Sequence, residues 1–365
     1  FQFGAMSKCS TVHALIEICH EWFKGTDNSR DRNFIHAVLV DYSKAFDRIN
    51  PNILLAKLEE FDIPPFLLHW VTDFLSSRSQ RVKLGDILSS ELEIWGTVPQ
   101  GTKLGVLLFL LMINDLRTEV PTYKYVDDTT LYRVSNDPCD TKLQDSVNTV
   151  VAWSKSNYMK LNTTKTKEML ITFSRPPPKV PSITVEGVPL ERVDCVTLLG
   201  VKLSADLTWH SHVQYIISKA QSRLFSLNLL RRAKVAPKDI VQVYCSKVRP
   251  VIEYAAPVWH SSLSKELSDN LEDLQIRALR IAYPMLSYEQ SLLESGLPSL
   301  SERRTSLCKM FFDKIQNPQD KLHRILTEKK DNPQNTRSGR KYPLPKTHTK
   351  RYKDSFLPFA LYNLQ

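Results

Sequence analysis

Two short acidic runs, each attached to an apolar stretch, constrain most strongly what this chain can fold into. Residues 35–40 are mostly apolar and rich in Val and Leu, which predicts a buried strand that ends at Asp41. Residues 123–132 carry Val, Thr and Tyr on both sides of Asp127 and Asp128, which predicts a tight hairpin with the acids at its tip. Because a bare carboxylate is costly to bury, the acids of both elements require a partner.

A divalent cation is the partner that suits clustered carboxylates. Hard cations such as Mg²⁺ or Mn²⁺ prefer oxygen ligands, and two such ions held about 4 Å apart are the machinery of nucleotidyl transfer. Two simpler interpretations stay open, since an Asp-Asp pair is common in solvated turns and an Asp after a strand often caps a helix. A third element lies between the two acidic runs and favours the metal-binding interpretation.

The third element combines a glycine-bearing loop with an apolar helix. Residues 98–105 contain Gly101 and Gly105, and glycine lets the backbone approach a ligand closely. Residues 106–113 are apolar but too few to span a membrane. An ordinary turn before a core helix would explain this pattern. A backbone platform that touches a nucleotide and a template strand would explain it as well.

Several further runs follow the order of the motifs of one polymerase family. They are Gln2-Phe3-Gly4 with residues 10–15, Leu161-Asn162 with Lys165-Thr166 and Met169, Leu199-Gly200-Val201 with Leu207-Thr208-Trp209 and His212, and the runs 249–254, 256–259 and 275–280. Residues 41–47, 98–109 and 125–128 match motifs A, B and C of the same family. With all of these runs in register, the chain resembles the reverse transcriptase of a non-LTR (LINE-type) retrotransposon, most similar to the CR1/jockey-like group.

The resemblance implies an α+β fold, that of a right-hand polymerase. Its palm is an antiparallel sheet with helices behind it, accompanied by partial fingers and a helical thumb. Because the motif series begins partway through the fingers, we expect a chain truncated at its N-terminus, with an endonuclease domain in the full-length element. The expected divisions are partial fingers over 1–34, a palm with motifs A to D over 35–175, a linker and primer-grip-like β unit over 176–205, a helical thumb over 206–285, and a C-terminal extension with a basic tail over 286–365.

The resemblance also implies roles for the acidic residues. Asp41 is expected to bridge two Mg²⁺ or Mn²⁺ ions, Asp127 to be the second ligand, and Asp128 to complete the acidic cluster. The backbone carbonyl of Tyr42 is a further expected ligand, next to the nucleotide. Lys165 is the expected general acid that protonates the leaving pyrophosphate. A plain surface lysine is the competing interpretation, because other lysines lie close by in the sequence.

Four other residues are expected to bind the incoming nucleotide. Phe46 matches the side chain that lies against the C2′ of the sugar and selects dNTPs over rNTPs, although a core aromatic would look the same in sequence. Gln100 and Gly101 are expected to contact the nucleotide and the template. Lys8 is the expected substitute for an arginine that grips the triphosphate, because Met6 stands where the family has that arginine.

The primer is expected to contact two backbone turns. These are Tyr125 and Val126 in the predicted hairpin, and Leu199 and Gly200 in the later β unit. The implied partners are therefore an RNA template, a DNA primer and dNTPs, with no membrane. An inactive remnant of such an element, which binds nucleic acid non-specifically, is the alternative function.

The composition agrees with a nucleic-acid partner. The 365 residues include 49 Lys plus Arg against 39 Asp plus Glu, for a net charge of +10 and a pI near 9.2, and a basic protein gains affinity for a polyanion by releasing counterions. Six cysteines without Cys-x-x-Cys spacing argue against a zinc site or a disulfide framework and for a reducing compartment. We expect an intracellular protein, in nucleus and cytoplasm, because neither a signal peptide nor a membrane-spanning run is found.

Periodicity predicts the remaining elements. Apolar spacing predicts helices over residues 12–23, 51–61, 65–75 and 143–159. Strands are expected over 81–84 and 92–95, and a proline-rich break at 176–181 is expected to precede a small β unit near 183–203.

The basic segment 329–353 predicts a mobile, solvated tail that attracts phosphates, because it contains prolines and few apolar residues. The alternative is that the end of the chain docks on the thumb through Phe356, Leu357 and Phe359.

Overall fold

The computed structural model describes residues 1–94, 98–99, 101–326 and 341–365. The described chain forms two compact units, each built from segments that are separated in the sequence. The five-part division expected from the motifs is finer than these two units and stays a prediction. The first unit comprises Phe1–Ser7, His36–Met169 and Lys179–Arg192, and the second comprises Lys8–Ile35, Leu170–Pro178 and Val193–Gln365.

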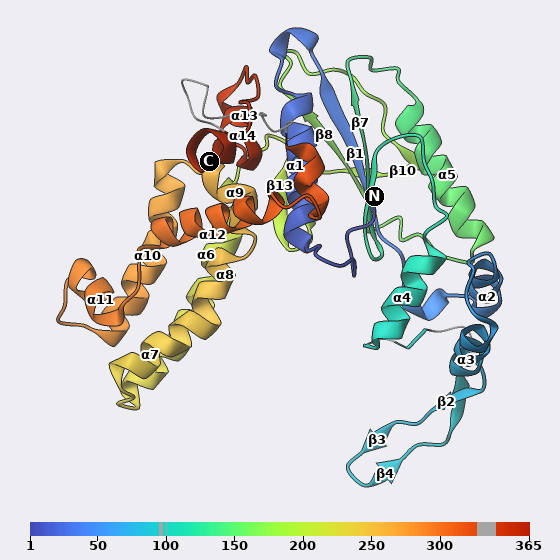
Figure 1. Ribbon diagram of the computed structural model, residues 1–365, viewed down its shortest axis with the longest axis horizontal. Coiled ribbons are helices and arrows are strands. Elements are labelled where there is room, and N and C mark those ends of the chain that lie inside the picture. The colour runs from blue at the N-terminus through green and yellow to red at the C-terminus, as the bar shows by residue number, and fades with distance from the viewer. Residues whose placement is uncertain (95–97, 100, 327–340) are drawn as a thin grey trace. The chain divides into compact units, whose positions relative to one another are not determined.

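A five-stranded sheet forms the centre of the first unit, in the order β11-β8-β1-β7-β6 (Figure 1). β6 pairs with β7 antiparallel, and the short β11 pairs with β8 parallel. Together with the helices around it, this sheet confirms the predicted α+β fold. The strands are β1 (Phe34–Val40), β6 (Thr122–Tyr125), β7 (Asp128–Ser135), β8 (Lys167–Thr172) and β11 (Glu191–Arg192).

The strand β1 confirms the buried strand that the sequence predicts, because all seven of its residues are buried. Its one polar residue, His36, is satisfied inside the sheet. The imidazole Nε2 of His36 lies 3.1 Å from a carboxylate oxygen of Glu168 on β8. This polar pair therefore permits an otherwise apolar strand to run through the core.

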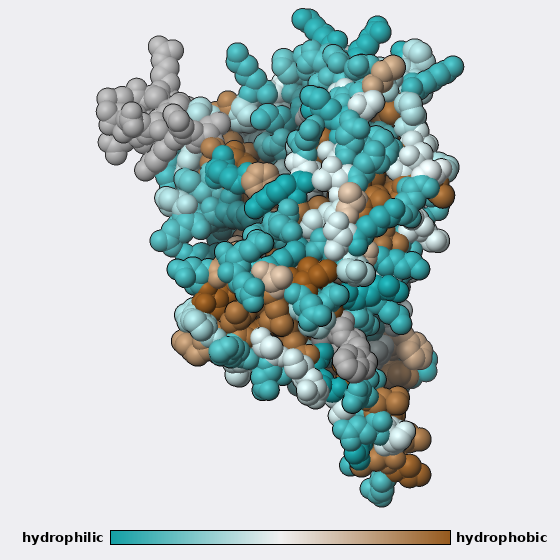
Figure 2. Space-filling view, turned by 90° about the vertical axis from the view of Figure 1, so that its right-hand side faces the viewer, coloured by the Kyte–Doolittle hydropathy of each residue, from teal (hydrophilic) through white to brown (hydrophobic). Residues whose placement is uncertain are grey.

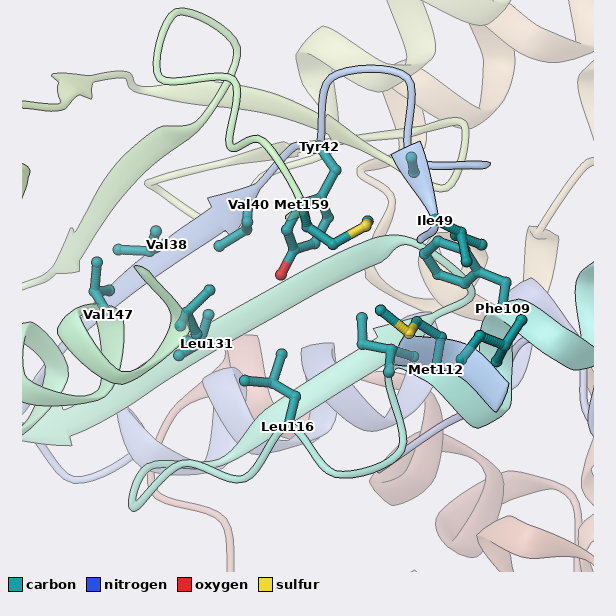
Figure 3. Close-up of a cluster of buried hydrophobic side chains, with 14 of the residues drawn as sticks. Val38, Val40, Tyr42, Ile49, Phe109, Met112, Leu116, Leu131, Val147 and Met159 are labelled. Atoms are coloured by element: carbon teal, nitrogen blue, oxygen red, sulfur yellow. The ribbon is translucent and has the colours of Figure 1, made fainter. Parts of the chain in front are cut away.

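Four helices complete the core of the first unit: α2 (Pro51–Glu59), α3 (Pro65–Leu75), α4 (Lys103–Met112) and α5 (Lys142–Ser156). They agree with the helices predicted over residues 51–61, 65–75, 106–113 and 143–159 to within a few residues. Figure 3 shows Val38 and Val40 of β1, Leu131 of β7, Val147 of α5 and Phe109 of α4 in one apolar cluster. Val38 and Val40 are two residues apart, so both lie on the same face of β1, and that face packs on this cluster.

An arm between α3 and α4 differs from the prediction. Its two ladders pair β2 (Arg78–Gln80) with β5 (Leu92–Ile94) and β3 (Lys83–Leu84) with β4 (Ile87–Leu88). The strand predicted over 81–84 is wrong at residues 81 and 82 and is confirmed at 83 and 84 by β3. The strand predicted over 92–95 is confirmed over 92–94 by β5, and Trp95 lies outside the described residues. Figure 2 shows apolar side chains at the tip of this arm, where the exposed residues are Val82, Leu84, Ile87 and Leu88.

The β unit predicted near 183–203 is present but divided. β9 (Thr184–Val185) pairs with β10 (Val188–Pro189), and both lie in the first unit. β12 (Cys195–Leu198) pairs with β13 (Val201–Ser204) in the second unit. Between these two hairpins, β11 joins the main sheet beside β8.

The second unit is mainly helical. Its N-terminal helix α1 (Thr11–Gly25) confirms the helix predicted over 12–23. No helix in the described part of the chain is long and apolar enough to cross a membrane. The other helices are α6 (His210–Arg232), α7 (Pro237–Val243), α8 (Arg249–Glu253), α9 (Ala256–Trp259), α10 (Lys265–Ala282), α11 (Tyr288–Ser295), α12 (Leu300–Ile315), α13 (Lys350–Lys353) and α14 (Phe356–Asn363).

The prediction of a mobile tail is wrong for residues 341–353. The buried carboxylate of Asp27 accepts hydrogen bonds from the backbone N–H groups of His348 and Thr349, each at 2.8 Å. After this anchor, α14 packs against α1, α9 and α12, with Phe356 and Leu357 buried. The prediction relied on the low content of apolar residues in this segment, which favours a solvated chain. The hydrogen bonds to Asp27, a residue far away in the sequence, order the segment instead.

Replacing Phe356 with Ala should lower the free energy of unfolding by about 3–5 kcal/mol, because a buried ring is lost. That ring meets Phe311 edge-on, with 5.6 Å between the ring centroids. Phe359→Ala is the matched control and should lower the free energy less, since Phe359 is only half-buried. Urea denaturation followed by circular dichroism measures both variants. If both variants lost equally little free energy of unfolding, that result would contradict the docking of α14.

Candidate active site

Asp41 directly follows β1, and its backbone is tied to the loop before β8. The backbone carbonyl of Asp41 accepts a hydrogen bond from the N–H of Asn162 at 2.8 Å. The N–H of Asp41 donates to the hydroxyl of Thr166 at 3.2 Å. These two bonds fix the position from which the carboxylate of Asp41 projects. Both partners belong to the run from Leu161 to Met169 that the sequence analysis matched to the polymerase family.

The predicted hairpin is confirmed, and its turn has an unusual backbone. Tyr125 pairs with Asp128 at the end of the ladder, so Val126 and Asp127 form the two-residue turn. Val126 has a φ of +59°, in the left-handed region that β-branched residues rarely adopt. Such strain is found mostly where the surrounding structure imposes it for function. The turn holds Asp127 at the tip, and Asp128 starts β7.

The segment Gln2-Phe3-Gly4 holds this turn in place. The side-chain carbonyl of Gln2 accepts hydrogen bonds from the N–H groups of Val126 at 3.1 Å and of Gly4 at 2.9 Å. A Cβ on Gly4 would lie 2.5 Å from the backbone nitrogen of Val126, so only glycine allows this approach. Sequence reasoning identified the run as a motif but missed its support of the acidic turn, because nothing in the sequence relates positions so far apart.

The carboxylates of Asp41, Asp127 and Asp128 act on one another. Burial raises the pKa of Asp127, and the charge of Asp41 raises it further. Burial and the charges of Asp127 and Asp41 raise the pKa of Asp128 to about 6. Although Asp128 keeps an exposed surface, protein atoms crowd its carboxyl group. The neighbouring strands β1 and β7 therefore place the three predicted acids near enough for the charge of Asp41 to act on Asp127 and Asp128.

The donor set fits a divalent cation in its chemistry, although the acids do not form a closed ligand shell. Among the described residues, no three His, Cys, Asp or Glu side chains lie close enough to hold a metal ion together. Mutual repulsion keeps carboxylates apart, and a cation between them removes that repulsion. Hard oxygen ligands are those that Mg²⁺ and Mn²⁺ prefer. Metal binding here stays a prediction.

Phe46 lies beside the acidic cluster in sequence and packs on the core. The short 3₁₀ helix Phe46–Arg48 contains it, and its ring stacks on Phe109 with 4.8 Å between the ring centroids. The side chain of Phe46 is half-buried, so part of its surface stays accessible. Both the sugar-selecting role and the core role expected for Phe46 remain compatible with this position.

The described residues just before and at the start of α4 make close contacts. Gly101 has a φ of +82°, which favours glycine. Thr102 caps α4, because its hydroxyl accepts a hydrogen bond from the N–H of Gly105 at 2.9 Å. A Cβ on Gly105 would collide with the carbonyl of Pro99. Gln100 lies outside the described residues.

Lys165 lies on the loop between α5 and β8 with an exposed side chain. Its backbone N–H donates to the backbone carbonyl and the side-chain carbonyl of Asn162, both at 3.2 Å. The same Asn162 binds the backbone of Asp41, so this loop is coupled to the acid through Asn162. The general-acid role of Lys165 stays a prediction.

The remaining predicted site residues lie in the second unit. Leu199 and Gly200 form a two-residue turn between β12 and β13, with φ values of +47° and +81°. The hydroxyl of Tyr254 donates to the carbonyl of Leu199 at 2.8 Å, and sequence reasoning missed this support. Lys8 is exposed, and its ammonium group donates a hydrogen bond to the side chain of Gln319.

Comparison with known proteins gives consistent matches. The family profile described as reverse transcriptase (RNA-dependent DNA polymerase) matches residues 1–203. The chain is 27% identical over 295 residues to the probable RNA-directed DNA polymerase from transposon BS of Drosophila melanogaster, covering 76% of this chain and 32% of that protein. It is 23% identical over 344 residues to the RNA-directed DNA polymerase from mobile element jockey of the same organism, covering 89% and 37%.

The chain thus spans about a third of the length of the curated relatives it matches. Among solved structures, the telomerase of Candida tropicalis in complex with a fragment of telomeric RNA is similar with a TM-score of 0.44 and 12% identity. That match covers 89% of this chain and 48% of the telomerase chain. Because the family profile covers more than half of its residues, the chain belongs to the reverse transcriptase family, and the relatives it matches are the polymerases of jockey-like, non-LTR transposons.

Proposed function

We propose that this chain is an RNA-directed DNA polymerase that adds dNTPs to the 3′-hydroxyl of a DNA primer on an RNA template. The observation that carries the proposal is the position of the three acids: Asp41 directly follows β1, and Asp127 and Asp128 lie at the start of the neighbouring strand β7. Clustered carboxylates suit two-ion nucleotidyl transfer. The relatives, named RNA-directed DNA polymerases, support the same reaction.

The acidic cluster would hold two Mg²⁺ or Mn²⁺ ions through Asp41, Asp127, Asp128 and the backbone carbonyl of Tyr42. The ions would lower the pKa of the attacking hydroxyl and neutralise charge on the phosphates. Tyr42 directly follows Asp41 in the chain, which makes its carbonyl the next backbone oxygen available beside that acid.

The protein's own part is to hold these oxygen atoms in place. The hydrogen bonds from Asn162 to Asp41 and from Val126 to Gln2 fix the backbone on both sides of the cluster. A ligand set held by backbone bonds needs little reorganisation when substrate binds, which is the main source of electrostatic catalysis. The strained turn at Val126 serves the same end, because it keeps Asp127 at the tip.

The nucleotide and its leaving group would contact residues around this cluster. The half-buried ring of Phe46 would exclude a 2′-hydroxyl. Gln100 and Gly101 would contact the nucleotide and the template through the loop before α4. Lys165 would give a proton to the leaving pyrophosphate, and Lys8 would bind the triphosphate as a point charge.

The primer would contact the backbone at two places. The first is Tyr125 and Val126, where β6 enters the acidic turn, and the second is the turn of Leu199 and Gly200. Gly200 has a φ of +81° and no side chain, so the backbone of the second turn can approach a strand closely. The hydrogen bond from Tyr254 to Leu199 would keep the second turn rigid.

Nucleic-acid binding without catalysis is a second candidate function. Met6 stands where the family has an arginine, and the side chain of Lys8 is engaged with Gln319. A basic chain without an effective grip on the triphosphate would bind a primer and template but would not extend them. Primer extension on an RNA template with dNTPs and Mg²⁺ separates the two functions, because only a polymerase lengthens the primer.

Asp127→Asn should reduce primer extension far more than tenfold, which corresponds to a loss of over about 1.4 kcal/mol in transition-state stabilisation. Binding of primer and template should stay nearly unchanged, because the phosphates are gripped elsewhere. Asp273→Asn, an identical change at an exposed position of α10, is the control. Extension by Asp127→Asn within tenfold of the wild-type rate would overturn the ligand role.

Phe46→Val should raise the incorporation of ribonucleotides relative to dNTPs by roughly tenfold, because it removes the ring that would meet the 2′-hydroxyl. Phe46→Tyr keeps the ring and should keep the selectivity. Competition between the two nucleotide types in single-turnover extension measures the ratio. An unchanged ratio in a Phe46→Val protein with native melting behaviour would make Phe46 a core residue only.

Asp128→Asn should make the protein more stable at pH 7 in metal-free buffer. Since the pKa of Asp128 is raised from 3.8 to about 6, the folded chain binds this proton more tightly than the unfolded chain does. The wild-type protein therefore loses stability as the pH rises from about 4 through about 6, and the variant lacks that loss.

Melting temperatures at pH 4 and pH 7 measure this difference, with Asp273→Asn as the control. Added Mg²⁺ should raise the melting temperature of the wild-type protein at pH 7 and raise that of Asp128→Asn less, because a ligand stabilises only the state that binds it. An equal response of the two proteins to Mg²⁺ would contradict a ligand role for Asp128.

A further inference from the structure

A cavity of about 300 Å³ in the second unit is lined by three segments that lie far apart in the sequence. The loop after α1 contributes Arg32, the chain after β8 contributes Phe173 and Arg175, and the docked C-terminal segment contributes Thr349 and Arg351. None of these residues belongs to the proposed active site. The docking of residues 341–365 therefore completes a cavity that the first two segments alone would leave open.

Three arginines line the cavity, and one nearby acid, Asp27, faces them. Arg32, Arg175 and Arg351 all line it, and within the described ranges none of them forms a salt bridge. Asp27 attracts Arg351, but its buried carboxylate already accepts three hydrogen bonds from His348 and Thr349. One acid with its oxygens occupied leaves an excess of positive charge among the three arginines.

Arg351 is held in a fixed orientation. Its guanidinium lies 3.4 Å from the ring centroid of Phe173, and its Nη2 donates to the carbonyl of Thr26 at 3.1 Å. A planar guanidinium stacked on a ring is pre-organised, so little entropy is lost when it binds an anion. The ring of Phe173 keeps 38% of its surface exposed.

We propose that this cavity binds a backbone phosphate of a nucleic acid strand, at a site separate from the proposed active site. Arg32 and Arg175 are exposed and offer planar N–H forks, which pair with phosphate oxygens through two parallel bonds. Arg351 adds a third, fixed positive charge. The exposed surface of Phe173 suits the sugar or base that flanks the phosphate, because aromatic rings stack on bases of any sequence.

A strand fits this site better than free phosphate does. A cavity of arginines beside an exposed ring matches the alternation of phosphate and base along a strand, whereas inorganic phosphate would use only the arginines. The net charge of +10 favours a polyanion in the same way. The inference rests on the proposed function only in taking nucleic acid as the partner.

The test compares charge reversals inside and outside the cavity in the full chain. Arg32→Glu and Arg175→Glu change two lining residues from different segments. Arg30→Glu makes the same change on an exposed neighbour that does not line the cavity. The dissociation constant of a short, labelled single-stranded RNA is measured by fluorescence anisotropy over a range of KCl concentrations, and melting temperatures identify any variant that fails to fold.

We expect Arg32→Glu and Arg175→Glu each to weaken RNA binding by about tenfold at low salt. Each should also reduce the slope of log K against log salt by about 0.7, the value for one lost phosphate contact on a single strand. Arg30→Glu should change both quantities less. If either lining variant fails to fold, the folded one decides, because the two lie on separate segments.

Two results would overturn the proposal. One is RNA binding by the lining variants that matches that of Arg30→Glu in affinity and slope. The other is displacement of RNA from the wild-type protein by inorganic phosphate at concentrations where sulfate has no effect, which would make the cavity a free-phosphate site. Primer extension is scored separately, so a chain that binds RNA through Arg175 but extends no primer would sustain this inference and contradict the proposed polymerase.

Discussion

Three mutually repelling carboxylates, those of Asp41, Asp127 and Asp128, are held at the ends of neighbouring strands, and the first unit is organised around them. Burying one Val or Leu side chain contributes about 1.5–3 kcal/mol. The fully buried β1 supplies several such side chains, so the core offsets the repulsion and keeps the acids in place.

The acidic turn shows how a strained backbone is maintained. A left-handed Val126 costs on the order of 1–3 kcal/mol, and the hairpin alone would relax it. Two contacts prevent relaxation: the hydrogen bond from Val126 to Gln2, and the close approach of Gly4, where no side chain fits. The segment at the start of the chain therefore belongs structurally to the turn that carries Asp127.

Periodicity and turn chemistry predicted the local elements, and long-range contacts explain what they missed. The buried strand β1, the hairpin around Asp127 and the helix α1 follow from patterns within a few residues, so the sequence alone was enough. The supports of the site, Gln2 beneath the turn and Tyr254 beneath Leu199, depend on residues brought together by folding. No rule of sequence spacing relates positions so far apart. The sequence therefore identified the three acids but did not predict the contacts that hold the turns in position.

The C-terminal segment shows why local composition misjudges order. Residues 341–353 are basic and poor in apolar side chains, which favours solvation. The buried acid Asp27 reverses this outcome, because three hydrogen bonds to His348 and Thr349 satisfy its carboxylate and anchor the segment. A lysine or arginine on a mobile segment attracts phosphates only through a time-averaged positive charge. Arg351 is stacked on Phe173, so its positive charge stays at one position. Because the segment is ordered, its residue Arg351 lines a defined cavity and does not belong to a mobile basic tail.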